Sequence, residues 1–202
     1  MNRLDLAWIR QRLAAHPPEP IASEKVERRA AVAAVLRFAP DRPGCDLLFI
    51  LRASHPDDPW SGHMAFPGGR TEDRDASALD TACRETREEL ELDLRRHGEL
   101  LGQLDDIRAS AGGRVLPLAI SPLVFRLTEP APLRPQPDEV EEIHWVPAAH
   151  LLDPASATTV PYVLNGLRFE LPSIQVGERV IWGLTYMMLM HLFSVLDWQV
   201  GA

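Results

Sequence analysis

The sequence predicts an α/β domain in which helices cover a mixed β-sheet. Two β-rich runs, residues 30–38 and 46–53, are separated by the turn-forming stretch APDRPG, which is typical of a hairpin with buried strands. A helical segment from Asp75 to about Leu90 follows, and more strand-like runs come after it. Because strands lie on both sides of a central helix and another helix ends the chain, helices and sheet are expected to form separate layers.

Two strands, a short helix and a hairpin are expected after the central helix. The apolar run VLPLAISPLVFRL, residues 115–127, is predicted to be a buried strand that is broken or bulged at Pro117 and Pro122, because proline cannot donate to the ladder. The remaining predicted elements are a strand at 139–146, a short helix that begins at Pro147, and a hairpin at 162–171 that turns at Asn165 and Gly166.

Length and charge favour one domain that spans residues 1–202 and binds a small molecule. A chain of 202 residues with 46% hydrophobic residues can bury a sizeable core. An N-terminal helical segment, residues 1–28, and a C-terminal helix, residues 180–198, are expected to pack on that core. The net charge of -8 gives no basic surface for nucleic acid or for an anionic membrane, so neither is an expected partner. Binding of a phosphorylated ligand therefore needs a local source of positive charge, such as bound cations or a few arginines.

Three further features predict a reduced, cytoplasmic protein. Charges at Arg3, Asp5 and Arg10 interrupt the apolar run that a secretory signal requires. Cys45 and Cys83 form neither a metal-like cluster nor a disulfide framework. The longest apolar run, residues 180–196, is shorter than the roughly 20 residues that span a bilayer. We interpret this run as a helix that is buried or faces another subunit. Because it is apolar on more of its surface than one core-facing stripe requires, it predicts a twofold homodimer.

The stretch FPGGRTEDRDASALDTACRETREELEL, residues 66–92, places several acids directly behind a glycine pair. Asp75 is the expected N-cap of a helix that begins at Ala76. A stripe facing the core would contain Leu79, Ala82, Cys83, Thr86 and Leu90. Beside it, the spacing of Glu85, Glu88 and Glu89 puts three carboxylates on one flank, close enough to bind a common ion.

Two readings of this acidic flank remain open from the residues alone. In the structural reading, Arg84 and Arg87 neutralise the acids on a solvated helix face. In the functional reading, the loop around Gly68 and Gly69 lets the backbone approach a ligand closely. Carboxylates and an exposed backbone carbonyl are hard oxygen ligands, which Mg²⁺ or Mn²⁺ prefers. The functional reading is favoured, because the acids otherwise repel one another and oppose the helix dipole.

The same stretch resembles the Nudix box of the Nudix hydrolases. That pattern is a glycine, five residues, Glu, seven residues, then Arg-Glu-apolar-x-Glu-Glu-x-Gly-apolar. Its first glycine and its second half are matched by Gly69, Arg84, Glu85, Glu88 and Glu89. The chain departs from it in three places: Asp75 stands for the family's next Glu only if one extra residue is allowed before Arg84, Thr86 replaces an apolar residue, and Glu91 replaces the glycine.

The preceding stretch LFILRASHPDDPWSGHMAFPGG resembles the motif of the coenzyme A pyrophosphatases within that family. The matching residues are Leu48, Arg52, Ala53, Gly62, Phe66, Pro67, Gly68 and Gly69. Ile50 replaces a threonine, and Asp58 stands where the motif has its second arginine. An arginine there would be expected to meet a phosphate, so Asp58 bears directly on coenzyme A specificity.

The resemblance implies an α/β/α sandwich and metal-dependent hydrolysis of a nucleoside diphosphate derivative, with coenzyme A or acyl-coenzyme A as the expected substrate. It implies that Glu85, Glu88, Glu89 and the Gly68 carbonyl hold Mg²⁺ or Mn²⁺ and that Arg84 orients the carboxylates. Glu139 is the chosen base or extra ligand from a loop after the box. The expected substrate contacts come from Arg52, Gly68, Gly69 and Arg70, whereas a structural role is favoured for His63.

Other functions on the same fold remain as alternatives. The substrate could be a nucleotide sugar, a dinucleotide or a nucleoside triphosphate. A ligand-binding module without catalysis is a second alternative, although such a module could drop its acids and this chain keeps Glu85, Glu88 and Glu89. An isomerase would need a cysteine nucleophile, and neither Cys45 nor Cys83 is placed for that role.

Overall fold

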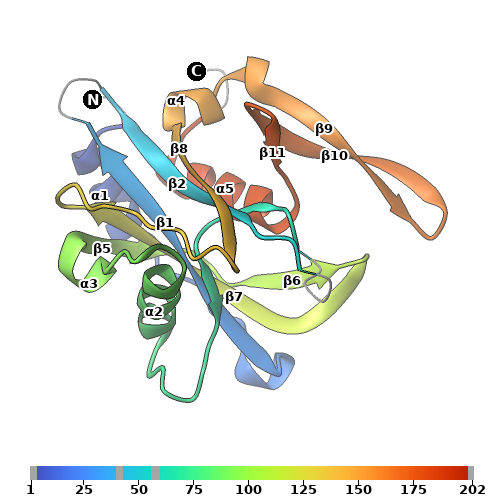
Figure 1. The fold of residues 1–202 in the computed structure, drawn as a ribbon, viewed down its shortest axis with the longest axis horizontal. Coiled ribbons are helices and arrows are strands. Elements are labelled where there is room, and N and C mark those ends of the chain that lie inside the picture. Colours follow the sequence, from blue (N-terminus) through green and yellow to red (C-terminus); the bar gives the residue numbers. More distant parts are fainter. Residues whose placement is uncertain (1–3, 40–42, 56–59, 200–202) are drawn as a thin grey trace.

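The computed structural model describes residues 4–39, 43–55 and 60–199, in which helices flank a central β-sheet (Figure 1). The main sheet has eight strands of mixed direction, and a separate sheet of three antiparallel strands follows it in the chain. The α/β sandwich with a mixed sheet that the sequence predicts is therefore confirmed.

Strand β1 (Arg28–Phe38) lies at the centre of the main sheet and is buried on both faces. It runs parallel to β7 (Arg114–Leu127) and antiparallel to β2 (Cys45–Arg52) and β4 (Gly68–Arg70). Its even-numbered apolar residues join one core cluster, with residues of the N- and C-terminal helices. Its odd-numbered residues join a second cluster, with residues of the acid-bearing helix. Because strand side chains alternate between faces, a single apolar strand supports both helical layers.

The outer strands extend the sheet on either side of β1. Strands β3 (Met64–Ala65) and β8 (Val140–Pro147) pair with β2, whereas β5 (Gly98–Gln103) and β6 (Ile107–Ala111) pair with β7. The hairpin predicted at residues 30–53 is confirmed, with Leu36 opposite Leu47.

A break of the long strand at Pro117 and Pro122 is not observed, because β7 continues from Arg114 to Leu127, but the bulge expected as the alternative is present at Pro117. Pro122 lies opposite the segment that joins β6 to β5, where neither edge strand needs a donor from it. Its carbonyl still accepts a hydrogen bond from the Leu104 amide at 2.9 Å. Pro117 lies in a bulge of β7, because residues 116–118 of β7 lie opposite the single residue 109 of β6.

Helices cover both faces of the sheet, and two of them are shorter than expected. The α-helices are α1 (Leu6–Ala14), α2 (Ala78–Leu90), α3 (Leu94–His97), α4 (Ala148–Leu151) and α5 (Gly183–Leu196), and single 3₁₀ turns lie at Ser23–Lys25 and Pro154–Ser156. The predicted helical segment 1–28 is therefore helical mainly over α1, and the predicted helix 180–198 loses its start to β11 (Arg179–Ile181). Within the described part of the chain, no helix has the length and apolar character needed to cross a membrane.

The smaller sheet is a hairpin that projects from the body of the molecule (Figure 1). Strands β9 (Ala157–Leu164) and β10 (Leu167–Val176) are joined by Asn165 and Gly166, and β11 completes the sheet. Both turn residues have positive φ angles of 51° and 79°, as a two-residue hairpin turn requires. The predicted hairpin and its turn are confirmed.

Candidate active site

The acid-bearing helix α2 begins two residues later than the sequence suggests. Ser77 is its N-cap and accepts a hydrogen bond from the Asp80 amide, so the expectation of an Asp75 cap and a start at Ala76 is wrong. Asp75 instead points its carboxylate at Arg84 and Thr81. An aspartate can cap a helix, but here the half-buried Arg84 offers this carboxylate a stronger, charge-assisted partner.

Close contacts explain the glycine pair at the edge of β4. Gly68 has a φ of 146°, and a Cβ there would lie 2.3 Å from the Ala31 carbonyl oxygen on β1. A Cβ on Gly69 would lie 2.6 Å from the carboxylate of Glu85. The two glycines therefore let the backbone pass between the central strand and the acids of α2.

Arg84 links Arg70, the last residue of β4, to the acids of the helix. Its guanidinium donates to Asp75 at 2.8 Å, to Glu85 at 2.9 Å and to Glu88 at 2.8 Å. It also donates to the Arg70 carbonyl at 2.8 Å. The hydrogen bond from Arg84 holds the pKa of the Asp75 carboxyl well below its usual range, and the Asp75 contact in turn raises the pKa of Arg84. The positive charge of Arg84 is therefore held within the acidic cluster.

Glu89 is the most deeply buried acid of the helix, with only 2% of the residue exposed. Its Oε2 accepts a hydrogen bond from the Gly68 amide at 2.8 Å, and its Oε1 lies 3.9 Å from Arg52. Burial raises the pKa of Glu89 to about 8, with a further contribution from the charges of Glu85 and Glu139. Burial likewise raises the pKa of Glu85. These acids ionise at a free-energy cost that a bound cation would offset.

A cavity of about 560 Å³ lies beside this cluster. Seven of the residues expected at the site line it: Arg52, Gly68, Gly69, Arg70, Glu85, Glu89 and Glu139. The Gln136 amide donates to the Glu89 carbonyl at 2.8 Å, and the Glu139 amide donates to the Gln136 carbonyl at 3.0 Å. These backbone bonds tie the loop before β8 to the end of α2, which places Glu139 against the same cavity as the helical acids.

Glu88 does not line the cavity, and the expected three-carboxylate cluster is not assembled. Its carboxylate is exposed and bonds to Arg84 and Arg74. Within the described ranges, only His16, Asp105 and His191 bring three ligand atoms within 4.8 Å of one another. Arg84 lies between Glu85 and Glu88 while Glu89 turns to the Gly68 amide, so the binding of one cation by all three carboxylates stays a prediction.

The donor set of the cavity nevertheless suits a hard divalent cation. Glu85, Glu89 and Glu139 present oxygen ligands only, and the mutual repulsion of these carboxylates is relieved by positive charge. Glu88 would join them only after leaving Arg84. Whether the Gly68 carbonyl is a ligand stays a prediction, and Asp58 lies outside the described residues.

Much of the remaining wall is apolar or aromatic and was not anticipated from the sequence. Leu118 and Ile120 of β7 line it, together with Met188 of α5. Trp182 and His63 face the cavity with ring centroids 4.5 Å apart. Residues this distant in the chain give no common local pattern, and only the fold brings them together. The cavity thus has a charged end at α2 and an apolar end at α5.

Comparison with known proteins identifies the family to which the chain belongs. Residues 27–164 match the family model described as the NUDIX domain, so the chain belongs to the Nudix family of pyrophosphohydrolases. It is 33% identical over 168 residues to the human "Mitochondrial coenzyme A diphosphatase NUDT8", a match that covers 81% of this chain and 69% of that protein. It is 36% identical to the uncharacterized fission yeast protein C14C4.10c, with 78% of this chain and 52% of that protein covered.

A solved structure supports the fold alone. The MutT/nudix family protein from Enterococcus faecalis superposes with a TM-score of 0.52 at 16% sequence identity, covering 97% of this chain and 71% of that one. The expected membership of the Nudix family, and the resemblance to its coenzyme A pyrophosphatases, are therefore confirmed. Because the chain spans only about half of the fission yeast relative, the substrate and partners are matters for proposal.

Proposed function

We propose that the protein hydrolyses the diphosphate linkage of coenzyme A or a short acyl-coenzyme A, giving 3′,5′-ADP and 4′-phosphopantetheine or its acyl derivative. The observation that carries the proposal is the cavity in which Glu85, Glu89 and Glu139 meet Arg52 beside the glycine pair. Support for the substrate comes from the motif of residues 48–69 and from the name of the human relative. The human name also includes a mitochondrial location, whereas the sequence predicts a cytoplasmic one for this chain.

The acids of α2 are assigned to the cation and Arg84 to their orientation. Glu85 and Glu89 would hold Mg²⁺ or Mn²⁺, with Glu88 and the Gly68 carbonyl completing the ligands. When bound, the cation supplies charge that neutralises the diphosphate and acidifies water. Arg84 contacts Glu85 and Glu88 at 2.9 and 2.8 Å, which fits a role in fixing their carboxylates.

Glu139 is assigned as the base, or as an additional ligand, and the arginines as phosphate contacts. Glu139 lines the same cavity as Glu89, and its backbone is held by a hydrogen bond from the Ala53 amide to its carbonyl at 2.9 Å. Arg52 and Arg70 line the same cavity, in which a diphosphate would meet the acids through the cation. The apolar end leaves room for the rest of the substrate.

The test is hydrolysis of a panel of diphosphate compounds with Mg²⁺ or Mn²⁺, with phosphorus products identified. Coenzyme A should be cleaved, and chelator should abolish activity. Glu89→Gln should lower turnover at least about 100-fold, since several kcal/mol of charge stabilisation depend on the cation. Glu91→Gln is the matched control, because Glu91 ends the same helix, is exposed and pairs with Arg134 outside the cavity.

The panel also separates the alternatives. Cleavage of a nucleotide sugar or dinucleotide without cleavage of coenzyme A would support the assignment as a hydrolase but contradict coenzyme A as the substrate. Full activity in chelator or in Glu89→Gln would contradict the metal assignment. No cleavage of any compound, together with tight binding of one, would favour a ligand-binding module. Comparing coenzyme A with its form lacking the 3′-phosphate, in wild type and in Asp58→Arg, tests whether position 58 reads that phosphate; an unchanged preference would show that it does not.

A further inference from the structure

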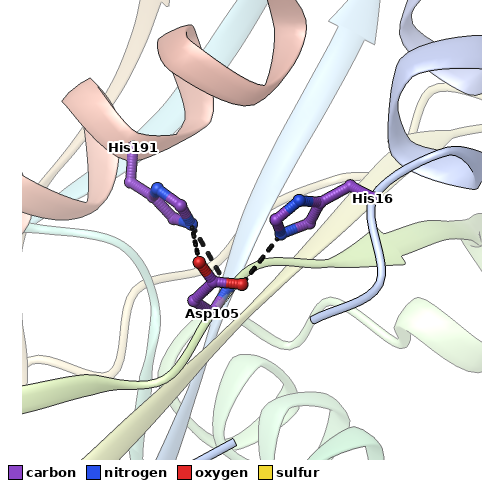
Figure 2. A group of neighbouring side chains, drawn as sticks. All are labelled: His16, Asp105 and His191. Carbon is purple, nitrogen blue, oxygen red and sulfur yellow. Dashed lines mark hydrogen bonds and ion pairs between the residues drawn. The ribbon is translucent and has the colours of Figure 1, made fainter. Parts of the chain in front are cut away.

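A second group of metal-binding side chains lies outside the catalytic cavity (Figure 2). His16 follows α1, Asp105 lies between β5 and β6, and His191 belongs to α5. The Nε2 atom of His16 lies 3.0 Å from Asp105 Oδ1, and the Nε2 atom of His191 lies 3.2 Å from Asp105 Oδ2. Three segments distant in the chain therefore point a nitrogen or oxygen ligand at one place.

Asp105 differs from its neighbour Asp106 in how its charge is balanced. Asp106 is almost fully buried and bonds to Arg29 and to the Ser121 hydroxyl. Among the described residues, Asp105 forms ion pairs with His16 and His191 only, and its Oδ1 also accepts a hydrogen bond from the Glu19 amide at 2.9 Å. Imidazole balances a carboxylate only when it is protonated, whereas an arginine always does. The Asp105 site therefore lacks a permanent positive charge.

The two imidazoles are not hydrogen-bonded to Asp105 in the ordinary way. The backbone amide of Asp105 donates to His191 Nε2 at 3.3 Å, so this nitrogen presents a lone pair toward the aspartate. This hydrogen bond is longer than most N–H hydrogen bonds. A metal ion that took its place would therefore replace only a weak interaction. His16 Nε2 is buried, and despite its 3.0 Å approach to Asp105 it makes no hydrogen bond of acceptable geometry. One imidazole nitrogen without a hydrogen bond, and a second held only by a long one, therefore face the same carboxylate.

We propose that His16, Asp105 and His191 bind one transition-metal ion, with Zn²⁺ the best fit. Tetrahedral zinc with ligands at about 2.0 to 2.2 Å separates neighbouring ligand atoms by about 3.3 to 3.6 Å. The two observed nitrogen-to-oxygen distances of 3.0 and 3.2 Å lie slightly below this range. All three ligand atoms lie within 4.8 Å, so small ring rotations close the site, and partial exposure leaves a fourth position for water.

The ligand types separate this site from the carboxylate end of the cavity. Imidazole nitrogen favours zinc and its neighbours in the transition series, whereas Mg²⁺ prefers oxygen. An ion here would link the segment after α1, the β5–β6 connection and α5. His191 lies one turn from Met188, which lines the cavity, so the ion would also hold the apolar wall in place. The site is structural in this proposal and acts on substrate only through α5.

The test measures Zn²⁺ retained after equilibrium dialysis in excess Mg²⁺, together with the melting temperature with and without Zn²⁺. Wild type should retain one ion per chain and melt at a higher temperature with it. His16→Gln and His191→Gln should each lower the Zn²⁺ affinity at least about tenfold, the lower end of what even outer-shell changes cost. His97→Gln is the matched control, because His97 pairs with a single carboxylate, Glu129, at 2.9 Å.

Two results would overturn the proposal. One is wild-type retention of Zn²⁺ that disappears in Glu89→Gln, which would place the ion in the catalytic cavity. The other is unchanged retention in His16→Gln with its circular dichroism spectrum intact. His16 follows the end of α1 and supports no regular element, so this variant separates metal binding from folding even where His191→Gln is unstable. Retention in Glu89→Gln equal to wild type would support the site independently of activity.

Discussion

At the scale of single residues, Glu89 is almost fully buried. Its proposed role as a metal ligand nevertheless requires an ionised carboxylate. Desolvation raises the pKa of this group, and only the Gly68 amide and Arg52 act in the opposite direction. In the absence of metal, the folded protein therefore favours a protonated Glu89 at pH values where an exposed glutamate is charged. A divalent cation changes this balance, since a ligand carboxylate must be ionised.

The resulting prediction concerns stability against pH in chelator. The pKa of Glu89 is about 8 in the folded state against an ordinary value of 4.5, so its contribution to stability is complete below pH 4.5 and is lost as the pH rises through 8. Glu89→Gln, which stays neutral, should be more stable than wild type at pH 8, by on the order of a few kcal/mol, and should lose most of that advantage by pH 4.5. Urea unfolding at both pH values measures the difference.

Other groups that titrate in this range are common to both proteins, so the comparison isolates Glu89. Parallel stability curves for wild type and Glu89→Gln would show that burial does not perturb this carboxyl. Added Mn²⁺ should reverse the order at pH 8, because wild type alone keeps the full ligand set.

At the scale of elements, the strand β4 and helix α2 form the site through close contact. The two glycines of β4 differ in what an added methyl group would meet. At Gly68 it would meet the backbone of Ala31 at a positive φ, whereas at Gly69 it would meet the mobile carboxylate of Glu85. The same substitution should therefore have different effects at neighbouring positions.

Gly69→Ala should keep the fold and lose activity, because Glu85 can move away but then leaves its place in the cavity. We expect at least a tenfold lower rate with a melting temperature within a few degrees of wild type. Gly68→Ala should instead lower the free energy of unfolding by about 1 to 3 kcal/mol or more, because its backbone cannot yield. Thermal unfolding and initial rates separate the two effects, and a fully active Gly69→Ala would argue against the placement of Glu85.

The same scale shows which elements the sequence could predict. Periodicity and turn residues located β1, β2, β8, α2 and the β9–β10 hairpin, because these signals are local. Local patterns failed where a distant partner decides. Pro122 is accommodated by the gap between β5 and β6, and Asp75 is drawn from a helix cap by Arg84. The acids of the cavity were predicted from their spacing, but its apolar wall and the His16 cluster depend on contacts that no single stretch of sequence contains.

At the scale of the whole molecule, the homodimer predicted from the sequence needs a different surface. The argument relied on α5 having an apolar face beyond what the core covers. Within α5 only Met187 and Ser194 are exposed, because α1, β6 and β10 pack against the rest of this helix. The premise that α5 has an uncovered apolar face is therefore wrong, and the dimer itself stays a prediction.

The projecting β9–β10 hairpin has the apolar surface that α5 lacks. The register pairs Leu167 with Leu164, Phe169 with Tyr162 and Leu171 with Val160, so these six side chains share one face. Leu167 is 64% exposed and Phe169 42% exposed, and the other four are half-buried. The opposite face carries Arg168 and Glu170 together with the exposed Val163. An exposed apolar face of this kind is typical of a surface that packs on a partner, and a twofold dimer would pair it with its own copy.

Light scattering at micromolar concentration should therefore give a mass of about 45 kDa, twice the 22.6 kDa of one chain. Phe169→Glu should shift the protein to the monomer, because it places a charge in the middle of the apolar face without touching the core. Met187→Glu, on the exposed part of α5, should leave the dimer intact and serves as the control. A wild-type monomer would reject the dimer. Dissociation by Met187→Glu but not by Phe169→Glu would show that the dimer interface lies on α5 instead of the hairpin.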